Sequence, residues 1–189
     1  MFDITNVRVY GLDESIVRSK YPMSVDVSKL NSEITNMTRN LGSCRTGEGH
    51  DNFLNGIVVQ FDVNASIKWW TEAERYHFLD FVSSQSTMHR IGRFKINKQC
   101  NEYVSPIVIN AVELKQREYE MNPTPENYLK LLYNTPVGFE LTAGMTTNYR
   151  QLKTIHQQRK DHRLPEWKTF CKWIETLPKF KELCLGGES

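Results

Sequence analysis

Residues 49–90 read GHDNFLNGIVVQFDVNASIKWWTEAERYHFLDFVSSQSTMHR, and this stretch decides the fold prediction. β-branched residues and a phenylalanine gather at 56–63 (GIVVQFDV), which is typical of a β-strand. Apolar and aromatic residues then recur every three or four positions, which predicts a helix. The residues on its expected buried face are Ile67, Trp70, Ala73, His77 and Phe81.

Two basic-aromatic groups, Arg75-Tyr76-His77 and His89-Arg90, flank a serine-rich segment at the predicted end of this helix. Hydroxyls, imidazoles and guanidinium groups together suit a phosphate or a cofactor better than a protein core. Structural interpretations stay open, because a histidine on an aromatic helix face is often a core residue and serines are common in surface turns.

The composition of the whole chain predicts one folded domain, 1–189. Its 189 residues are 39% hydrophobic and 11% aromatic, which argues against disorder. No apolar run is long enough for a membrane span, and residues 1–11 lack the layout of a signal peptide, so we expect a cytoplasmic protein. The four cysteines are scattered without a CxxC pair, which predicts free thiols and no metal site.

The charge distribution favours a small anion over nucleic acid as a partner. The net charge is only +2, but residues 147–182 hold nine lysines and arginines against four acidic residues. Such a segment attracts an anion, although a solvated basic face has the same sequence pattern.

The remaining periodicity predicts a mixture of helices and strands. Residues 91–103 are ambiguous between a strand and an ordered loop. Thr124 is a candidate N-cap followed by Pro125. We expect strands at 4–10 and 137–146, and helices at 28–41 (ended by Gly42), 107–121, 125–133, 149–159 and from Pro165 onward.

Two separated stretches resemble the flavin-dependent thymidylate synthases. In the first, a Gly-His pair at 49–50 precedes a strand and a helix, and Arg75-Tyr76-His77 stands where that family has an Arg-His-Arg triplet. Phe81, Ser84-Gln85-Ser86 and His89-Arg90 then follow in the family's order. In the second, Asn148-Tyr149-Arg150-Gln151-Leu152 is similar to the family's Asn-x-Arg-x-Leu helix, with Arg159 eleven residues after the asparagine. Tyr76 and His77 depart from the triplet.

The resemblance implies an α+β fold with a small antiparallel sheet packed with several helices, a homotetramer, and methyl transfer to dUMP. FAD would be the cofactor, with NADPH and a methylene-folate as co-substrates. By the same resemblance, the catalytic residues would be Arg75, His77 and Ser86. The cofactor-binding residues would be His50, Arg75, His77 and Asn148, and the nucleotide-binding residues Ser84, Gln85, Ser86, Arg90, Arg150 and Arg159.

Several alternatives remain open on the sequence. Arg159 shares a helix stripe with Leu152 and Ile155, so it points inward and needs either an anionic ligand or a salt bridge with Glu72 or Glu74. Asn148 could be a helix N-cap only. The altered triplet also permits another one-carbon transfer to a pyrimidine deoxynucleotide, or a non-catalytic nucleotide-binding or assembly protein. No GxGxxG, P-loop, HExxH or GxSxG pattern occurs.

Overall fold

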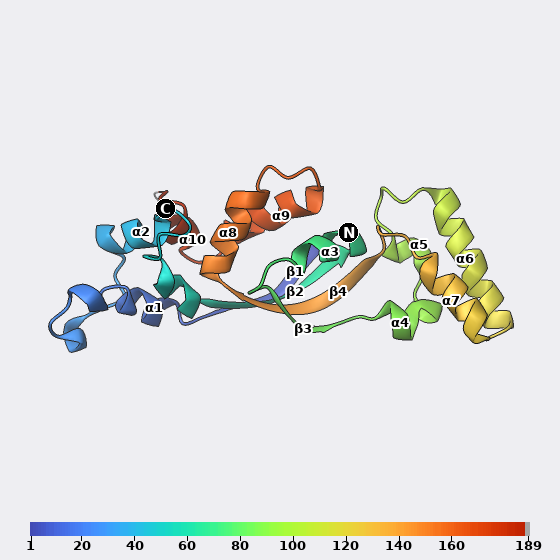
Figure 1. The fold of residues 1–189 in the computed structure, drawn as a ribbon, viewed down its shortest axis with the longest axis horizontal. Helices are drawn as coiled ribbons and strands as arrows, with labels where there is room; N and C mark the ends of the chain where they lie inside the picture. The colour runs from blue at the N-terminus through green and yellow to red at the C-terminus, as the bar shows by residue number, and fades with distance from the viewer. Residues whose placement is uncertain (188–189) are drawn as a thin grey trace. The chain divides into compact units, whose positions relative to one another are not determined.

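The computed structural model describes residues 1–187 and confirms the α+β prediction. It contains a four-stranded antiparallel sheet in the order β1-β2-β4-β3 (Figure 1). The strands are β1 (Asp3–Tyr10), β2 (Val58–Ser66), β3 (Asp80–Ser84) and β4 (Glu140–Asn148). The strand predicted at 4–10 is confirmed, whereas β2 and β4 each begin a few residues later than predicted.

Alternating burial explains why the two inner strands form. In β2, the side chains of Val59, Phe61 and Val63 are buried, and Gln60 between them is exposed. This two-residue period is what a pleated strand with one face on a core requires. Residues Asn52–Gly56 form a 3-10 helix that takes up the first residue of the predicted strand, so β2 starts later.

The chain divides into two compact units, and four of the five boundaries between them fall inside strands. The first unit comprises 1–5, 62–75 and 81–144, and the second comprises 6–61, 76–80 and 145 onward. The first holds α3 (Ile67–Ala73), α4 (Thr87–Arg90), α5 (Ile96–Gln99), α6 (Pro106–Met121) and α7 (Pro125–Tyr133). The second holds α1 (Leu12–Arg18), α2 (Asn36–Ser43), α8 (Tyr149–Arg159), α9 (Pro165–Ile174) and α10 (Phe180–Cys184).

In the first unit, α6 and α7 form a helical hairpin (Figure 1). Thr124 ends the connection between them and caps α7, its side chain accepting a hydrogen bond from the backbone N–H of Asn127, so the predicted N-cap is confirmed. The hairpin packs on a core that consists of Ile91, Ile96, Val112, Leu131 and Phe139.

In the second unit, α8 and α9 pack together, as their predicted amphipathic faces require. Phe61 of β2 lies between rings of α9, with ring centroids 5.9 Å from Phe170 and 4.7 Å from Trp173. Tyr149 of α8 meets Phe180 of α10 edge-on at 5.2 Å. These aromatic contacts join β2 to α9 and α8 to α10.

The predicted helix face from Ile67 to Phe81 is wrong in its second half. Helix α3 ends at Ala73, and Phe81 belongs to β3. His77 is exposed, which also excludes its interpretation as a core histidine. The helix does not continue because residues 80–84 pair with strand β4, which outweighs the helical pattern of the local sequence. Just after β3, the backbone N–H of Gln85 donates to the carbonyl of Thr142 at 2.9 Å.

The helix predicted at 28–41 is also wrong in extent. Thr35 caps α2 by accepting a hydrogen bond from the N–H of Thr38, so the helix begins at Asn36. Gly42 lies inside α2 and does not end it. A Cβ at this position would lie 2.2 Å from the carbonyl oxygen of Leu183, so Gly42 permits the close approach of α10.

The ambiguous segment 91–103 is helical in short pieces. It contains a 3-10 turn, Ile91–Arg93, followed by α5. All four cysteines are free thiols, as predicted. Between residues 1 and 187, no helix is both long and apolar enough to cross a bilayer, and no cluster of three His, Cys, Asp or Glu residues could hold a metal ion.

Candidate functional site

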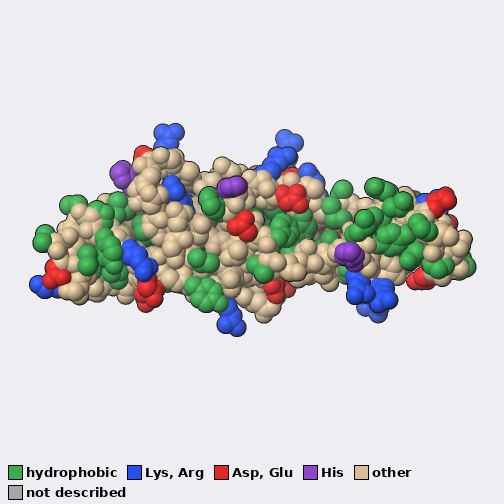
Figure 2. All heavy atoms as spheres, turned by 60° about the horizontal axis from the view of Figure 1, so that its bottom comes forward, with side chains coloured by type: hydrophobic (Ala, Val, Ile, Leu, Met, Phe, Trp, Pro, Cys, Tyr) green, Lys and Arg blue, Asp and Glu red, His purple; other side chains and the backbone are tan. Residues whose placement is uncertain are grey.

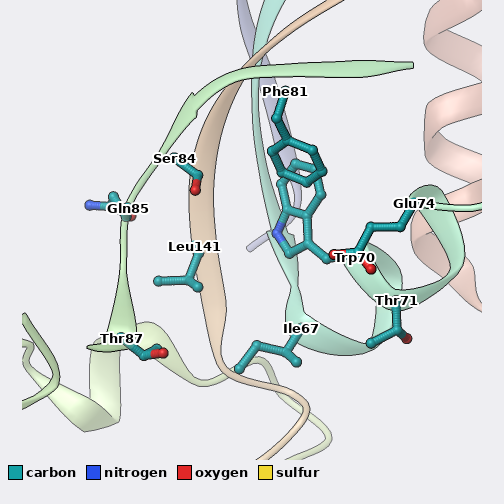
Figure 3. Close-up of a pocket in the computed structure, with 9 residues that line it drawn as sticks. All are labelled: Ile67, Trp70, Thr71, Glu74, Phe81, Ser84, Gln85, Thr87 and Leu141. Atoms are coloured by element: carbon teal, nitrogen blue, oxygen red, sulfur yellow. The ribbon is translucent and has the colours of Figure 1, made fainter. Parts of the chain in front are cut away.

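A cavity of about 260 Å³ lies in the first unit, between α3 and the chain that runs from β3 into α4 (Figure 3). Its wall combines aromatic, aliphatic and hydroxyl side chains with one carboxylate. The lining residues are Ile67, Trp70, Thr71, Glu74, Phe81, Ser84, Gln85, Thr87 and Leu141.

Two aromatic rings form one wall of this cavity. The centroids of Trp70 and Phe81 are 4.8 Å apart and their planes are tilted by 44°. Trp70 is buried, and its indole N–H donates to the carbonyl of Ala65 at 3.0 Å, which fixes the ring. Phe81 is 42% exposed, because β3 is an edge strand. A planar ring system can stack on such a surface.

The opposite wall is polar. The hydroxyls of Ser84 and Thr87 point into the cavity (Figure 3). Gln85 secures this segment to β4, because its Oε1 accepts a hydrogen bond from the N–H of Thr142 at 2.9 Å. The one carboxylate of the lining, Glu74, lies on the side of Trp70 at the end of α3 (Figure 3). The lining contains no lysine or arginine, so the cavity itself favours an uncharged ring over a phosphate.

Of the residues predicted from the first stretch, the structure brings Ser84 and Gln85 into the cavity wall. Ser86 is half-buried at the N-cap position of α4, and its carbonyl accepts the backbone N–H of Arg90 at 3.0 Å. Arg75 and Arg90 are exposed and lie outside the lining.

In the second unit, the start of α8 holds two more predicted residues. Asn148 is the N-cap of α8, and its side chain accepts a hydrogen bond from the N–H of Gln151 at 2.9 Å. Arg150 donates from Nε to the buried carboxylate of Asp51 at 2.9 Å. His50, next to that aspartate, is exposed.

At the other end of α8, Arg159 sits among aromatic rings. Its Nε donates to the hydroxyl of Tyr76 at 2.7 Å, and its guanidinium lies 5.5 Å from the Tyr76 ring centroid and 5.0 Å from that of Trp167. Arg159 is half-buried, as its helix stripe predicted. Tyr76 is buried, and its hydroxyl in turn donates to Gln158 at 3.0 Å. The middle residue of the Arg-Tyr-His group is therefore part of the core.

Comparison with known proteins gives a match in structure but none in sequence. No protein-family model matches the sequence, and no curated protein matches it. Thymidylate synthase X (ThyX) of Helicobacter pylori, solved with FAD and dUMP, superimposes with a TM-score of 0.74, covering 96% of both chains at 14% identity. The chain has the fold of the flavin-dependent thymidylate synthases.

A second solved structure with this fold extends the comparison. The UMP/dUMP methylase PolB of Streptomyces cacaoi, solved with 5-bromo-dUMP, has a TM-score of 0.67 and 14% identity. The match covers 98% of this chain and 92% of PolB. The thymidylate synthase fold expected from the sequence is thus confirmed over almost the whole chain.

The sequence interpretation missed two charged residues of the second unit, Asp51 and Lys153. Lys153 is fully buried and pairs with Asp51. A signal for it was present, because Tyr149, Leu152, Lys153 and His156 share one face of α8, and all four are buried. No local pattern distinguishes Asp51 from a loop aspartate, since its partners lie about a hundred positions away.

Proposed function

We propose that this protein binds FAD and a pyrimidine deoxynucleotide, and that it catalyses methyl transfer to dUMP or a closely related one-carbon transfer. The observation that carries the proposal is the match of the whole fold to a ThyX structure that contains FAD and dUMP. The match to a UMP/dUMP methylase supports the wider class of pyrimidine nucleotide methylation.

The cavity of the first unit is the proposed site of the pyrimidine base. Its volume, about 260 Å³, lies just below the range of roughly 300–1,000 Å³ that is typical of small-molecule sites, so it suits a base and sugar and is too small for a dinucleotide. Trp70 and Phe81 would stack on the ring, and the hydroxyls of Ser84 and Thr87 would hydrogen-bond to its edge. Ser86 and Arg90 remain the proposed phosphate ligands, because hydroxyl and guanidinium donors suit a phosphate.

The start of α8 has donor groups that fit the diphosphate of FAD, so we propose Arg150, expected from the sequence to bind the nucleotide, as a ligand of the cofactor instead. Arg150 is half-buried, and within residues 1–187 its terminal guanidinium nitrogens have no protein partner. The loop before it contains Gly47 and Gly49 at positive φ, with open space around both. Such a loop gives an anion close access to the backbone. His50 and Asn148 complete the proposed cofactor ligands here.

The bound flavin would supply the redox chemistry, with NADPH and a methylene-folate as co-substrates. Arg75 and His77 are the proposed groups that contact the cofactor and polarise the pyrimidine. Both side chains are exposed in the single chain. Arg159, held by Tyr76, remains a proposed nucleotide ligand.

One observation favours a second candidate, a non-catalytic nucleotide-binding protein on the same fold. Tyr76 is buried and hydrogen-bonded to both Arg159 and Gln158, so the middle position of the altered triplet serves packing. An enzyme would have to use only the exposed members of that group.

We further propose a homotetramer, with α6 contributing a subunit contact. Ile107, Leu114 and Met121 are spaced by seven residues and are 81%, 57% and 80% exposed. Figure 2 shows hydrophobic side chains gathered on the α6–α7 segment, at the right of the view. A seven-residue apolar stripe is suited to packing against a second copy of the helix. Light scattering should give a smaller particle for Leu114→Glu than for the unaltered protein, and an unchanged mass would exclude α6 from the contact.

The reaction itself is tested by product analysis. The protein is incubated with dUMP, FAD, NADPH and methylene-tetrahydrofolate, and the nucleotides are separated and identified by mass. A product heavier than dUMP by one methyl group supports thymidylate synthesis, and a hydroxymethyl product supports the related transfer. No product in the presence of bound FAD and dUMP would leave the non-catalytic candidate.

A further inference from the structure

Three charged residues of the second unit form a buried network beside the proposed diphosphate ligand. The side chains of Lys153 and Asp51 are 0% and 3% exposed, and that of Arg150 is 35% exposed. Burial of an ionic group is costly unless it is paired and hydrogen-bonded, so the network needs an explanation.

Lys153 has no capacity left for a ligand. Its ammonium group donates to the carbonyl oxygens of Gly42 at 2.8 Å and Cys44 at 2.6 Å, and to Asp51 Oδ2 at 2.8 Å. An ammonium group has three N–H donors, and all three are used inside the protein. Cys44 and Asp51 are the two ends of the loop 44–51, and Gly42 lies in the last turn of α2, so Lys153 holds both ends of this loop against α8.

Asp51 divides its carboxylate between two cations. Oδ2 receives Lys153, and Oδ1 receives Nε of Arg150 at 2.9 Å. A guanidinium group bonded through Nε has one edge fixed, while its two terminal nitrogens keep four N–H donors. Two cations and one carboxylate leave the network with a net positive charge. Of its three members, Arg150 alone is partly exposed, so a ligand can reach this charge at the Arg150 guanidinium.

We propose that Asp51 is a positioning residue: held by Lys153, it orients Arg150 so that the terminal guanidinium nitrogens bind the diphosphate of the cofactor. This inference rests on the proposed function, because it assigns Arg150 to that ligand. Asp51 does not touch the ligand and acts only through Arg150. An unoriented arginine would lose side-chain entropy on binding, and the network removes this cost in advance.

A double-mutant cycle distinguishes positioning from a purely structural role. FAD affinity is measured by flavin fluorescence for the unaltered protein, Asp51→Asn, Arg150→Ala and the double variant, each checked for folding by circular dichroism. We expect Asp51→Asn to weaken FAD binding about tenfold when Arg150 is present, and to have almost no effect when it is absent. An equal loss in both backgrounds would overturn the positioning role. The exposed Asp13 of α1, also changed to Asn, is the matched control and should bind FAD normally.

A second variant covers the case in which Asp51→Asn does not fold, since that change leaves Lys153 without its counter-charge. Arg150→Lys keeps the positive charge but has no Nε–H that could bond Asp51 while other donors face the ligand. We expect its FAD affinity to fall almost as far as that of Arg150→Ala. Affinity close to the unaltered protein would show that orientation by Asp51 is not needed.

ADP and inorganic pyrophosphate separate this inference from the proposed function. If the unaltered protein binds FAD, ADP and pyrophosphate and the cycle shows no coupling, the proposed function stands and the inference is wrong. If it binds none of the three, the proposed cofactor site is wrong and the inference falls with it.

Discussion

Phe81 gives a direct test of the base site, because its ring lines the cavity yet contributes only modestly to the core. It is 42% exposed, so slightly more than half of its surface is buried. Full burial of a phenylalanine is worth about 1.5–3 kcal/mol, so Phe81→Ala should lose roughly 1–1.5 kcal/mol of hydrophobic stabilisation. The aromatic pair with Trp70, at 4.8 Å, adds about 0.5–1.5 kcal/mol. The expected total, about 2 kcal/mol, leaves a typical domain folded.

Phe81→Ala should also weaken the binding of dUMP. Stacking of a base on an aromatic side chain is worth about 1–3 kcal/mol, so Phe81→Ala should weaken dUMP binding by about 5- to 150-fold. The assay is isothermal titration calorimetry with dUMP in the presence of FAD, with unfolding in urea measured in parallel.

Phe78 provides the matched control. It is 56% exposed, its ring meets His77 at 5.2 Å, and it does not line the cavity. Phe78→Ala should therefore keep the dUMP affinity of the unaltered protein. If the two variants are folded and bind dUMP equally well, the base does not stack on Phe81 and the assignment of this cavity is wrong.

Three further predictions concern the second unit. Arg159→Ala should weaken nucleotide binding by about 1.5–3 kcal/mol in calorimetry, because it removes a charge-assisted donor. Gly42→Ala should lower the free energy of unfolding in urea by about 1–3 kcal/mol, since the added Cβ would lie 2.2 Å from the Leu183 carbonyl oxygen. The hydrogen bond from His156 holds the pKa of Glu175 below its usual value of 4.5. The stabilisation is therefore complete above pH 4.5 and is lost as the pH falls through the lower folded value. Glu175→Gln should cost under about 1 kcal/mol at pH 7, because the pair is partly exposed, and nothing in strong acid.

Each of these predictions has an outcome that contradicts it. Unchanged nucleotide affinity in a folded Arg159→Ala protein would remove this arginine from the site. Unaltered stability of Gly42→Ala would mean that α2 and α10 can separate without cost. A loss of stability in Glu175→Gln that persists in strong acid could not come from the carboxylate charge.

The sequence predicted most reliably those elements whose signals are local. Helix α7 has its N-cap at Thr124 and a proline at the first helical position, and both signals lie within the helix's own residues. The strand at 4–10 and helix α8 were likewise recognisable from period and capping. The thymidylate synthase fold was recognisable from two short patterns, although no family model matches the sequence.

The failures share a physical cause, which is pairing between distant residues. The helix predicted through Phe81 ends early because residues 80–84 pair with the sheet, and nothing within the segment marks that competition. The aromatic wall of the cavity depends on the same early end of the helix, because Phe81 packs against Trp70 from strand β3. Asp51 was missed for this reason too, because its contact with Lys153 joins positions 102 residues apart.

The central claim is that the protein binds FAD and dUMP together. The most direct measurement is the visible absorption spectrum of the protein after incubation with FAD and gel filtration, recorded before and after addition of dUMP. We predict a flavin band that elutes with the protein and changes shape when dUMP is added, because group transfer requires the nucleotide and the flavin to come into contact. A colourless protein that cannot be loaded with FAD would contradict the account and leave only the shared fold.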